Sequence, residues 1–132
     1  MSKSIKLKND IYFDSKGIQA KVINPTINDN YVYSSDLDIC CFKLNNIAII
    51  KINTIAFKSE IPNFDIIMSN LPKCKSPDCI SYLYARHCNN QEAVRVRINS
   101  SGQMVKHYSV EPYYGSSANY QYSGIFIYET ID

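Results

Sequence analysis

Four residues that could bind a soft metal ion lie within fifteen positions of the chain: Cys74, Cys79, His87 and Cys88. Zinc accepts thiolate and imidazole ligands in tetrahedral sites. The spacing is not that of a zinc knuckle or ribbon, and the adjacent His87 and Cys88 would point to opposite faces of a strand. We therefore expect structural thiols here and no metal.

A cysteine nucleophile would need a histidine base within hydrogen-bonding reach and a third group to orient that base. Cys74 or Cys88 with His87 or His107 offers the residue types, but the sequence has no local signature for such an arrangement. No catalytic residue is predicted from this set.

Asp36 and Asp38 would share one side of a strand, which is a possible basis for calcium binding or acid–base catalysis. Two carboxylates without further oxygen ligands are more typical of a solvated edge. We predict that the protein is not an enzyme and uses no cofactor.

Tyrosines crowd the segment that precedes and enters the last predicted strand. These are Tyr108, Tyr113, Tyr114, Tyr120 and Tyr122, around the small residues of positions 115–119. Loops of tyrosine, serine, glycine and asparagine suit recognition, because tyrosine offers a rigid apolar face with a hydroxyl group. Packing at the end of the domain or between subunits is the alternative. Tyr113, Tyr114 and Tyr120 are the candidate ligand-binding residues of this segment.

The three arginines, Arg86, Arg95 and Arg97, all lie in strands predicted for the middle of the chain. The planar donor fork of arginine suits carboxylated or phosphorylated glycans. A salt-bridged solvent face is the alternative, since exposed strand faces commonly carry charge. Arg86 and Arg97 join the candidate ligand-binding residues.

Composition limits the remaining function classes. A chain of 132 residues fits one domain, and its net charge of +2 is too small to predict nucleic-acid binding. No apolar run approaches the roughly 20 residues needed to cross a bilayer, so no membrane insertion is expected. Five cysteines cannot all pair within the chain, which favours synthesis in a reducing cytosol. Cys40 and Cys41 should point to opposite faces of their strand.

Isoleucine, valine, tyrosine and phenylalanine dominate, a balance that favours strands over helices. The predicted strands run over residues 5–7, 11–13, 37–44, 47–57, 64–71, 80–86, 93–98, 104–110 and 122–131. In the clearest of them, Val94, Val96 and Ile98 alternate with two arginines, and Ser101-Gly102 then allows an antiparallel return from Gln103. We predict an all-β antiparallel sandwich of jelly-roll type.

The first 30 residues differ from the rest, because they are rich in lysine and end in the turn signals Asn24-Pro25 and Asn28-Asp29-Asn30. We expect residues 1–30 to form an appendage or linking segment and residues 31–132 to form the β-sandwich domain.

Three sequence patterns together resemble the C-terminal head, or tip, domains of phage tail-fibre and receptor-binding proteins. A strand at 64–71 enters Leu71-Pro72-x4-Pro77, the strand at 94–98 leads to Ser101-Gly102, and Tyr122 to Tyr128 forms a closing strand. The match covers roughly residues 37–132. The opening residues 4–17 are also similar to segments in structural proteins of phages of low-GC Gram-positive bacteria.

The resemblance implies a homotrimer of β-sandwich protomers that binds a host cell-surface saccharide and associates with other phage tail proteins. It places the protein in the virion after synthesis in the bacterial cytoplasm. The ligand of the candidate residues Tyr113, Tyr114, Tyr120, Arg86 and Arg97, which were chosen for their side-chain chemistry, would then be a saccharide. The alternatives are a purely structural tail component without a ligand and a carbohydrate-binding module detached from an enzyme.

Overall fold

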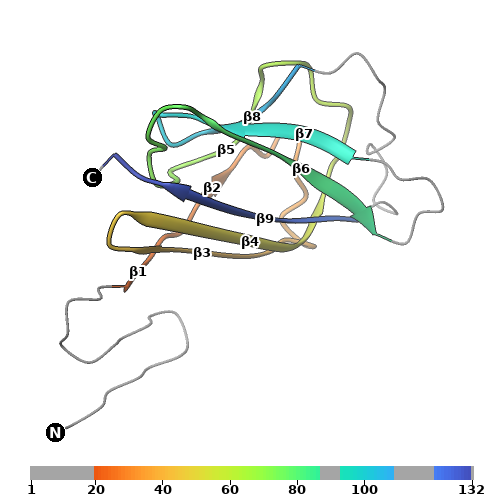
Figure 1. Cartoon of the computed structure of the whole chain (residues 1–132). Helices are drawn as coiled ribbons and strands as arrows, with labels where there is room; N and C mark the ends of the chain where they lie inside the picture. The colour runs from red at the N-terminus through yellow and green to blue at the C-terminus, as the bar shows by residue number, and fades with distance from the viewer. Residues whose placement is uncertain (1–19, 87–92, 109–120, 132) are drawn as a thin grey trace, which may run out of the picture.

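The structure, a computed structural model, describes residues 20–86, 93–108 and 121–131, and it contains nine strands and no helix in those ranges (Figure 1). The strands are β1 (Ala20–Val22), β2 (Thr26–Ile27), β3 (Asp38–Leu44), β4 (Ile47–Ala56), β5 (Ile66–Ser69), β6 (Cys79–Arg86), β7 (Ala93–Ile98), β8 (Met104–Lys106) and β9 (Gln121–Glu129). No helix of the described residues could therefore span a bilayer.

All nine strands belong to one sheet, in the order β1-β3-β4-β9-β6-β7-β8-β5-β2, and every pairing is antiparallel. The prediction of an all-β antiparallel protein is confirmed. β1 and β2 fall inside the segment 1–30 that the sequence analysis set apart, and the first 19 residues of that segment lie outside the described part, as do the strands expected at 5–7 and 11–13.

The two ends of this sheet must lie close together, because the outermost strands are neighbours in the chain. Only residues 23–25 separate β1 from β2, and four peptide steps span at most about 14 Å. The sheet therefore curls into a half-barrel, as Figure 1 shows. A side-chain hydrogen bond closes the gap, since the Asn70 Nδ2 donates to the backbone oxygen of Asn24 at 3.0 Å.

Side chains on the inside of the curl form the core. The central strands contribute Ala48, Ile50 and Ile52 from β4, Val94, Val96 and Ile98 from β7, and Tyr122, Phe126 and Tyr128 from β9. The alternation expected in β7 is confirmed: its valines and isoleucine are fully buried, and its arginines are partly exposed. In β4 a register shift after Ile52 changes the phase, so that Ile55 also reaches the core.

β5 and β8 are shorter than the sequence predicts. Phe64 and Asn70, which bracket β5, have φ angles of +74° and +61°, outside the range of extended strands. β8 ends at Lys106, whereas the predicted strand runs to residue 110. Residues 109 and 110 lie outside the described residues.

The predicted glycine hairpin is present between β7 and β8. Gly102 has a φ of +72°, and a Cβ atom there would overlap the carbonyl oxygen of Leu71. The Asn99 Oδ1 accepts hydrogen bonds from the backbone N–H groups of Ser101 and Gln103, both at 3.0 Å. Because the Leu71 N–H also donates to the Gly102 oxygen at 3.0 Å, the hairpin lies directly beside the Leu-Pro segment.

Candidate functional site

The predicted binding residues are only partly described. Tyr113, Tyr114 and Tyr120 lie outside the described residues, and Arg86 ends β6 with a side chain that is also outside them. Arg97 projects from the outer side of β7, where its Nη1 lies 3.8 Å from the Asp78 carboxylate. Its proposed role in saccharide binding therefore stays a prediction.

Two tyrosines of the same segment have opposite environments. Tyr122 is completely buried, and its ring lies 5.4 Å from that of Phe57, centroid to centroid. Tyr108 is 51% exposed and stacks on Phe64 with a centroid separation of 6.5 Å. Tyr122 is therefore a core residue, whereas Tyr108 remains accessible to a partner.

The thiols of the described residues do not form a metal site. Cys74 is buried, and its Sγ lies 3.3 Å from the Lys75 backbone oxygen. Burial raises the pKa of both Cys74 and Cys79, which keeps their thiols protonated and poorly nucleophilic. In the described part of the chain no group of three histidine, cysteine or acidic side chains could hold a metal ion, while His87 and Cys88 lie outside that part.

The adjacent Cys40 and Cys41 point to opposite faces, as predicted: Cys40 is exposed and Cys41 is buried. Burial, with a contribution from the neighbouring Cys40, raises the pKa of Cys41 to about 12. Asp36 and Asp38 are both exposed, and the Asn53 Nδ2 donates to the Asp38 carboxylate at 3.4 Å. This edge is solvated, as expected.

The most distinctive exposed surface lies on the outer side of the sheet, over β6 and β9. We call it the outer patch and define it by five side chains that are between 39% and 62% exposed: Ile80, Tyr82, Tyr84, Ile125 and Ile127. These strands lie at the middle of the sheet rather than at its ends (Figure 1). Several exposed apolar side chains on two neighbouring strands are typical of a binding or subunit surface.

Tyr82 and Tyr84 form an aromatic pair within the outer patch. Their ring centroids are 5.8 Å apart, and the rings are tilted by 36°. Tyr84 stands opposite Ala93 on one side and Ser123 on the other. Because both neighbours are small, they leave much of Tyr84 accessible, and this residue is 57% exposed. Such a ring can stack against the apolar face of a sugar or against a subunit.

A cationic margin borders the pair on the side of β7. Arg95 is the direct cross-strand partner of Tyr82, and Arg97 is that of Ile80. Burial and the two guanidinium charges lower the pKa of the nearby His107, whose imidazole is therefore neutral at pH 7. The charge beside Tyr82 thus comes from the arginines, which can donate hydrogen bonds to hydroxyl or carboxylate oxygens.

Sequence reasoning did not single out Tyr82, Tyr84, Ile125 or Ile127. A signal was nevertheless present, because Ile125-Phe126-Ile127-Tyr128 is apolar at every position. Such a run normally indicates a strand that is covered on both faces. In the described residues only the inner face of β9 is covered.

Comparisons with protein-family models, with curated proteins and with solved structures found no match. The site must therefore be interpreted from its own geometry.

Proposed function

We propose that this chain is the head domain of a phage tail fibre or receptor-binding protein, which adheres to a saccharide on the host cell surface. The observation that carries the proposal is the exposed Tyr82–Tyr84 pair beside Arg95 on the outer face of the antiparallel sheet. The family resemblance stated above supplies the phage context and the virion as the location.

In this proposal the two rings stack on the apolar face of a sugar ring, and the arginine margin donates hydrogen bonds to its oxygens. Both tyrosines are anchored in the middle of a strand, so little conformational entropy is lost when they bind. The predicted residues Tyr113, Tyr114, Tyr120, Arg86 and Arg97 remain part of this proposal as further saccharide-binding residues.

Homotrimerisation is the second part of the proposal. Ile125 and Ile127 are 57% and 62% exposed on a strand that is apolar at successive positions, which favours burial against another copy of the chain. Three weak saccharide sites on one head would act together through a high effective concentration. We further propose that each protomer is a head of the jelly-roll sandwich type. The head would attach to other tail proteins.

A purely structural tail component is the second candidate function. The observation that favours it is the same outer patch, because subunit contacts alone could cover all five of its side chains. Tyrosine is enriched in protein interfaces as well as in saccharide sites, so accessibility in the assembled oligomer separates the two functions.

The test is a binding assay with the fluorescently labelled oligomer on cells of low-GC Gram-positive bacteria and on a glycan array. We expect saccharide-dependent adhesion that falls about tenfold in Tyr84→Ala, as expected from the loss of one aromatic stack, and that persists in Tyr84→Phe. A wild-type oligomer that adheres to no cell and no glycan would favour the structural component. A monomer at micromolar concentration would contradict the trimer.

A further inference from the structure

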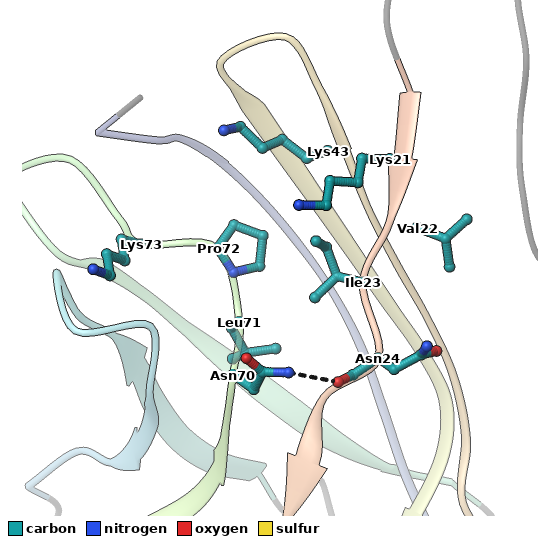
Figure 2. Close-up of a pocket in the computed structure, with 9 residues that line it drawn as sticks. All are labelled: Lys21, Val22, Ile23, Asn24, Lys43, Asn70, Leu71, Pro72 and Lys73. Carbon is teal, nitrogen blue, oxygen red and sulfur yellow. Dashed lines mark hydrogen bonds between the residues drawn. The ribbon is translucent and has the colours of Figure 1, made fainter.

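A groove of about 430 Å³ lies where the two ends of the curled sheet approach each other. We call it the seam groove. One wall is formed by β1 and β3, and the other by residues 70–73, which follow β5 (Figure 2). Its volume is within the range of small-molecule sites. The groove exists because the short link between β1 and β2 brings these walls together without pairing them.

Among the described residues, those that line the seam groove include three lysines and no acidic residue. Lys21 comes from β1, Lys43 from β3, and Lys73 from the segment after Leu71-Pro72. Figure 2 shows Lys21 and Lys43 side by side on one wall and Lys73 on the other. The groove is therefore a concentration of positive charge on a chain whose overall charge is only +2.

The pairing of β1 with β3 places two of these lysines next to each other. Lys21 and Lys43 are direct cross-strand partners in the antiparallel register, which places both side chains on the same face of the sheet. Both therefore contribute positive charge to the same wall of the seam groove.

The opposite wall is held in place by hydrogen bonds to separate parts of the fold. The Asn70 Nδ2 donates to the Asn24 oxygen at 3.0 Å, the Tyr128 hydroxyl donates to the Pro72 oxygen at 2.7 Å, and the Ile131 N–H donates to the Lys73 oxygen at 3.1 Å. The backbone that carries Lys73 is thus fixed before a ligand arrives, which lowers the entropic cost of binding.

The floor and walls also contain apolar and amide groups. Ile23 and Pro72 offer apolar surface, and the Asn70 amide, whose Nδ2 donates to the Asn24 oxygen, has an Oδ1 that can accept from a hydroxyl group. A combination of lysines, amides and small apolar surfaces fits a sugar that carries a negative charge better than it fits a bare inorganic ion.

We propose that the seam groove binds an anionic saccharide polymer through phosphodiester or carboxylate groups along its chain. This inference rests on the proposed saccharide adhesion and names the chemical class of the ligand. Lysine acts as a point charge and does not select between the planar carboxylate and the tetrahedral phosphate, so both chemistries fit. The outer patch and the seam groove would then contact different parts of one polymer.

The experiment measures the affinity of the full chain for three soluble probes by titration calorimetry: a glycerol-phosphate oligomer, an oligogalacturonate and neutral maltohexaose. We expect the anionic probes to bind more tightly than maltohexaose. Their affinity should fall steeply between about 0.01 M and about 1 M salt, over which the screening length shrinks from about 30 Å to about 3 Å. Comparison of the first two probes distinguishes phosphodiester from carboxylate recognition.

The decisive variants are Lys21→Gln with Lys73→Gln, compared with the charge-matched control Lys58→Gln with Lys75→Gln. The control lysines do not line the seam groove: Lys58 lies 5.7 Å from the Tyr33 ring centroid, and Lys75 pairs with Glu129 at 3.2 Å. The groove variant should bind the anionic probes at least about tenfold more weakly than the control variant. Unfolding by urea verifies that both variants are folded.

Equal affinities of the two double variants for the anionic probes would overturn the inference, because net charge alone would then explain binding. Cell adhesion separates this failure from a failure of the proposed function. If the wild type and the groove variant adhere equally well to cells, the groove inference fails and adhesion stands. If the wild type binds anionic probes at the groove and adheres to no cell, the groove stands and the adhesive function fails.

Discussion

The two faces of β9 carry similar residues in opposite environments. Phe126 and Tyr128 point inward and are at most 6% exposed, whereas Ile125 and Ile127 point outward and are at least 57% exposed. Apolar character alone therefore does not determine burial in this strand. The inner residues stabilise the protomer, and the outer residues contribute little to its folding, which leaves them available for contacts with a partner.

The largest expected effect comes from truncating the inner face. Phe126→Ala should lower the free energy of unfolding by about 3–5 kcal/mol, because it removes a buried ring and leaves a cavity. Ile127→Ala, the neighbouring outer change, should alter the unfolding of the isolated protomer by less than about 0.5 kcal/mol. Urea unfolding of both variants, at a concentration at which the protein is monomeric, measures the difference. Similar losses for the two would remove the distinction between the faces.

The next largest effect concerns assembly. Ile125→Asp with Ile127→Asp should weaken the proposed trimer by at least about a hundredfold, because it places charges in an apolar contact. Sedimentation equilibrium measures the dissociation constant. Lys51→Gln is a useful comparison, since Lys51 is exposed on β4 directly opposite Ile125. A double aspartate variant that assembles like the wild type would show that the outer patch does not contact another subunit.

Removing a hydroxyl group from each face gives a smaller effect. Tyr128→Phe should cost about 1–3 kcal/mol, because the buried Pro72 oxygen loses its donor at 2.7 Å. Tyr84→Phe should be neutral in the same unfolding measurement, because the Tyr84 side chain is exposed. If both changes are neutral, the hydrogen bond to Pro72 does not stabilise the fold.

Tyr128 also predicts a pH dependence. Burial raises the pKa of its hydroxyl in the folded state, whereas the unfolded chain loses this proton near pH 10. The folded state then binds more protons than the unfolded state, so stability should fall as the pH rises above about 10. In Tyr128→Phe the slope of stability against pH should be shallower over this range, as measured by urea unfolding at a series of pH values. The remaining slope would reflect groups such as Cys41.

The smallest effect is expected for an ion pair on the outer face. Lys75→Ala removes the 3.2 Å contact with Glu129, whose side chain is 49% exposed. Exposed pairs of this kind contribute at most about 1 kcal/mol, and salt screens them. Thermal unfolding at low and high salt should therefore hardly distinguish this variant from the wild type. A larger loss would mean that the outer face near the end of β9 contributes to protomer stability.

Local patterns predicted several elements well because their causes are local. β7 occupies the predicted positions 93–98, since its alternation of apolar residues and arginines has only one favourable register. Gly102 forms the predicted turn, because its positive φ and the close Leu71 carbonyl tolerate no side chain. β5 was predicted too long because nothing in the sequence showed that Phe64 and Asn70 adopt positive φ angles.

The candidate sites were less predictable, because each depends on contacts between distant parts of the chain. The sequence placed recognition in the tyrosine segment, of which Tyr113, Tyr114 and Tyr120 remain untested. It did not identify the outer patch, because a two-sided apolar strand does not reveal which face another element covers. Lys21 and Lys73 are far apart in sequence and line one groove only after the sheet curls.

By itself the sequence determined that the chain forms antiparallel strands, where β7 alternates, and where the glycine hairpin reverses direction. These properties depend on side-chain periodicity and on the backbone freedom of single residues. Only the tertiary structure decided that β9 exposes Ile125 and Ile127 and that the ends of the sheet enclose a lysine-lined groove. The physical reason is that burial and the clustering of charge are properties of the curled sheet, which no segment possesses on its own.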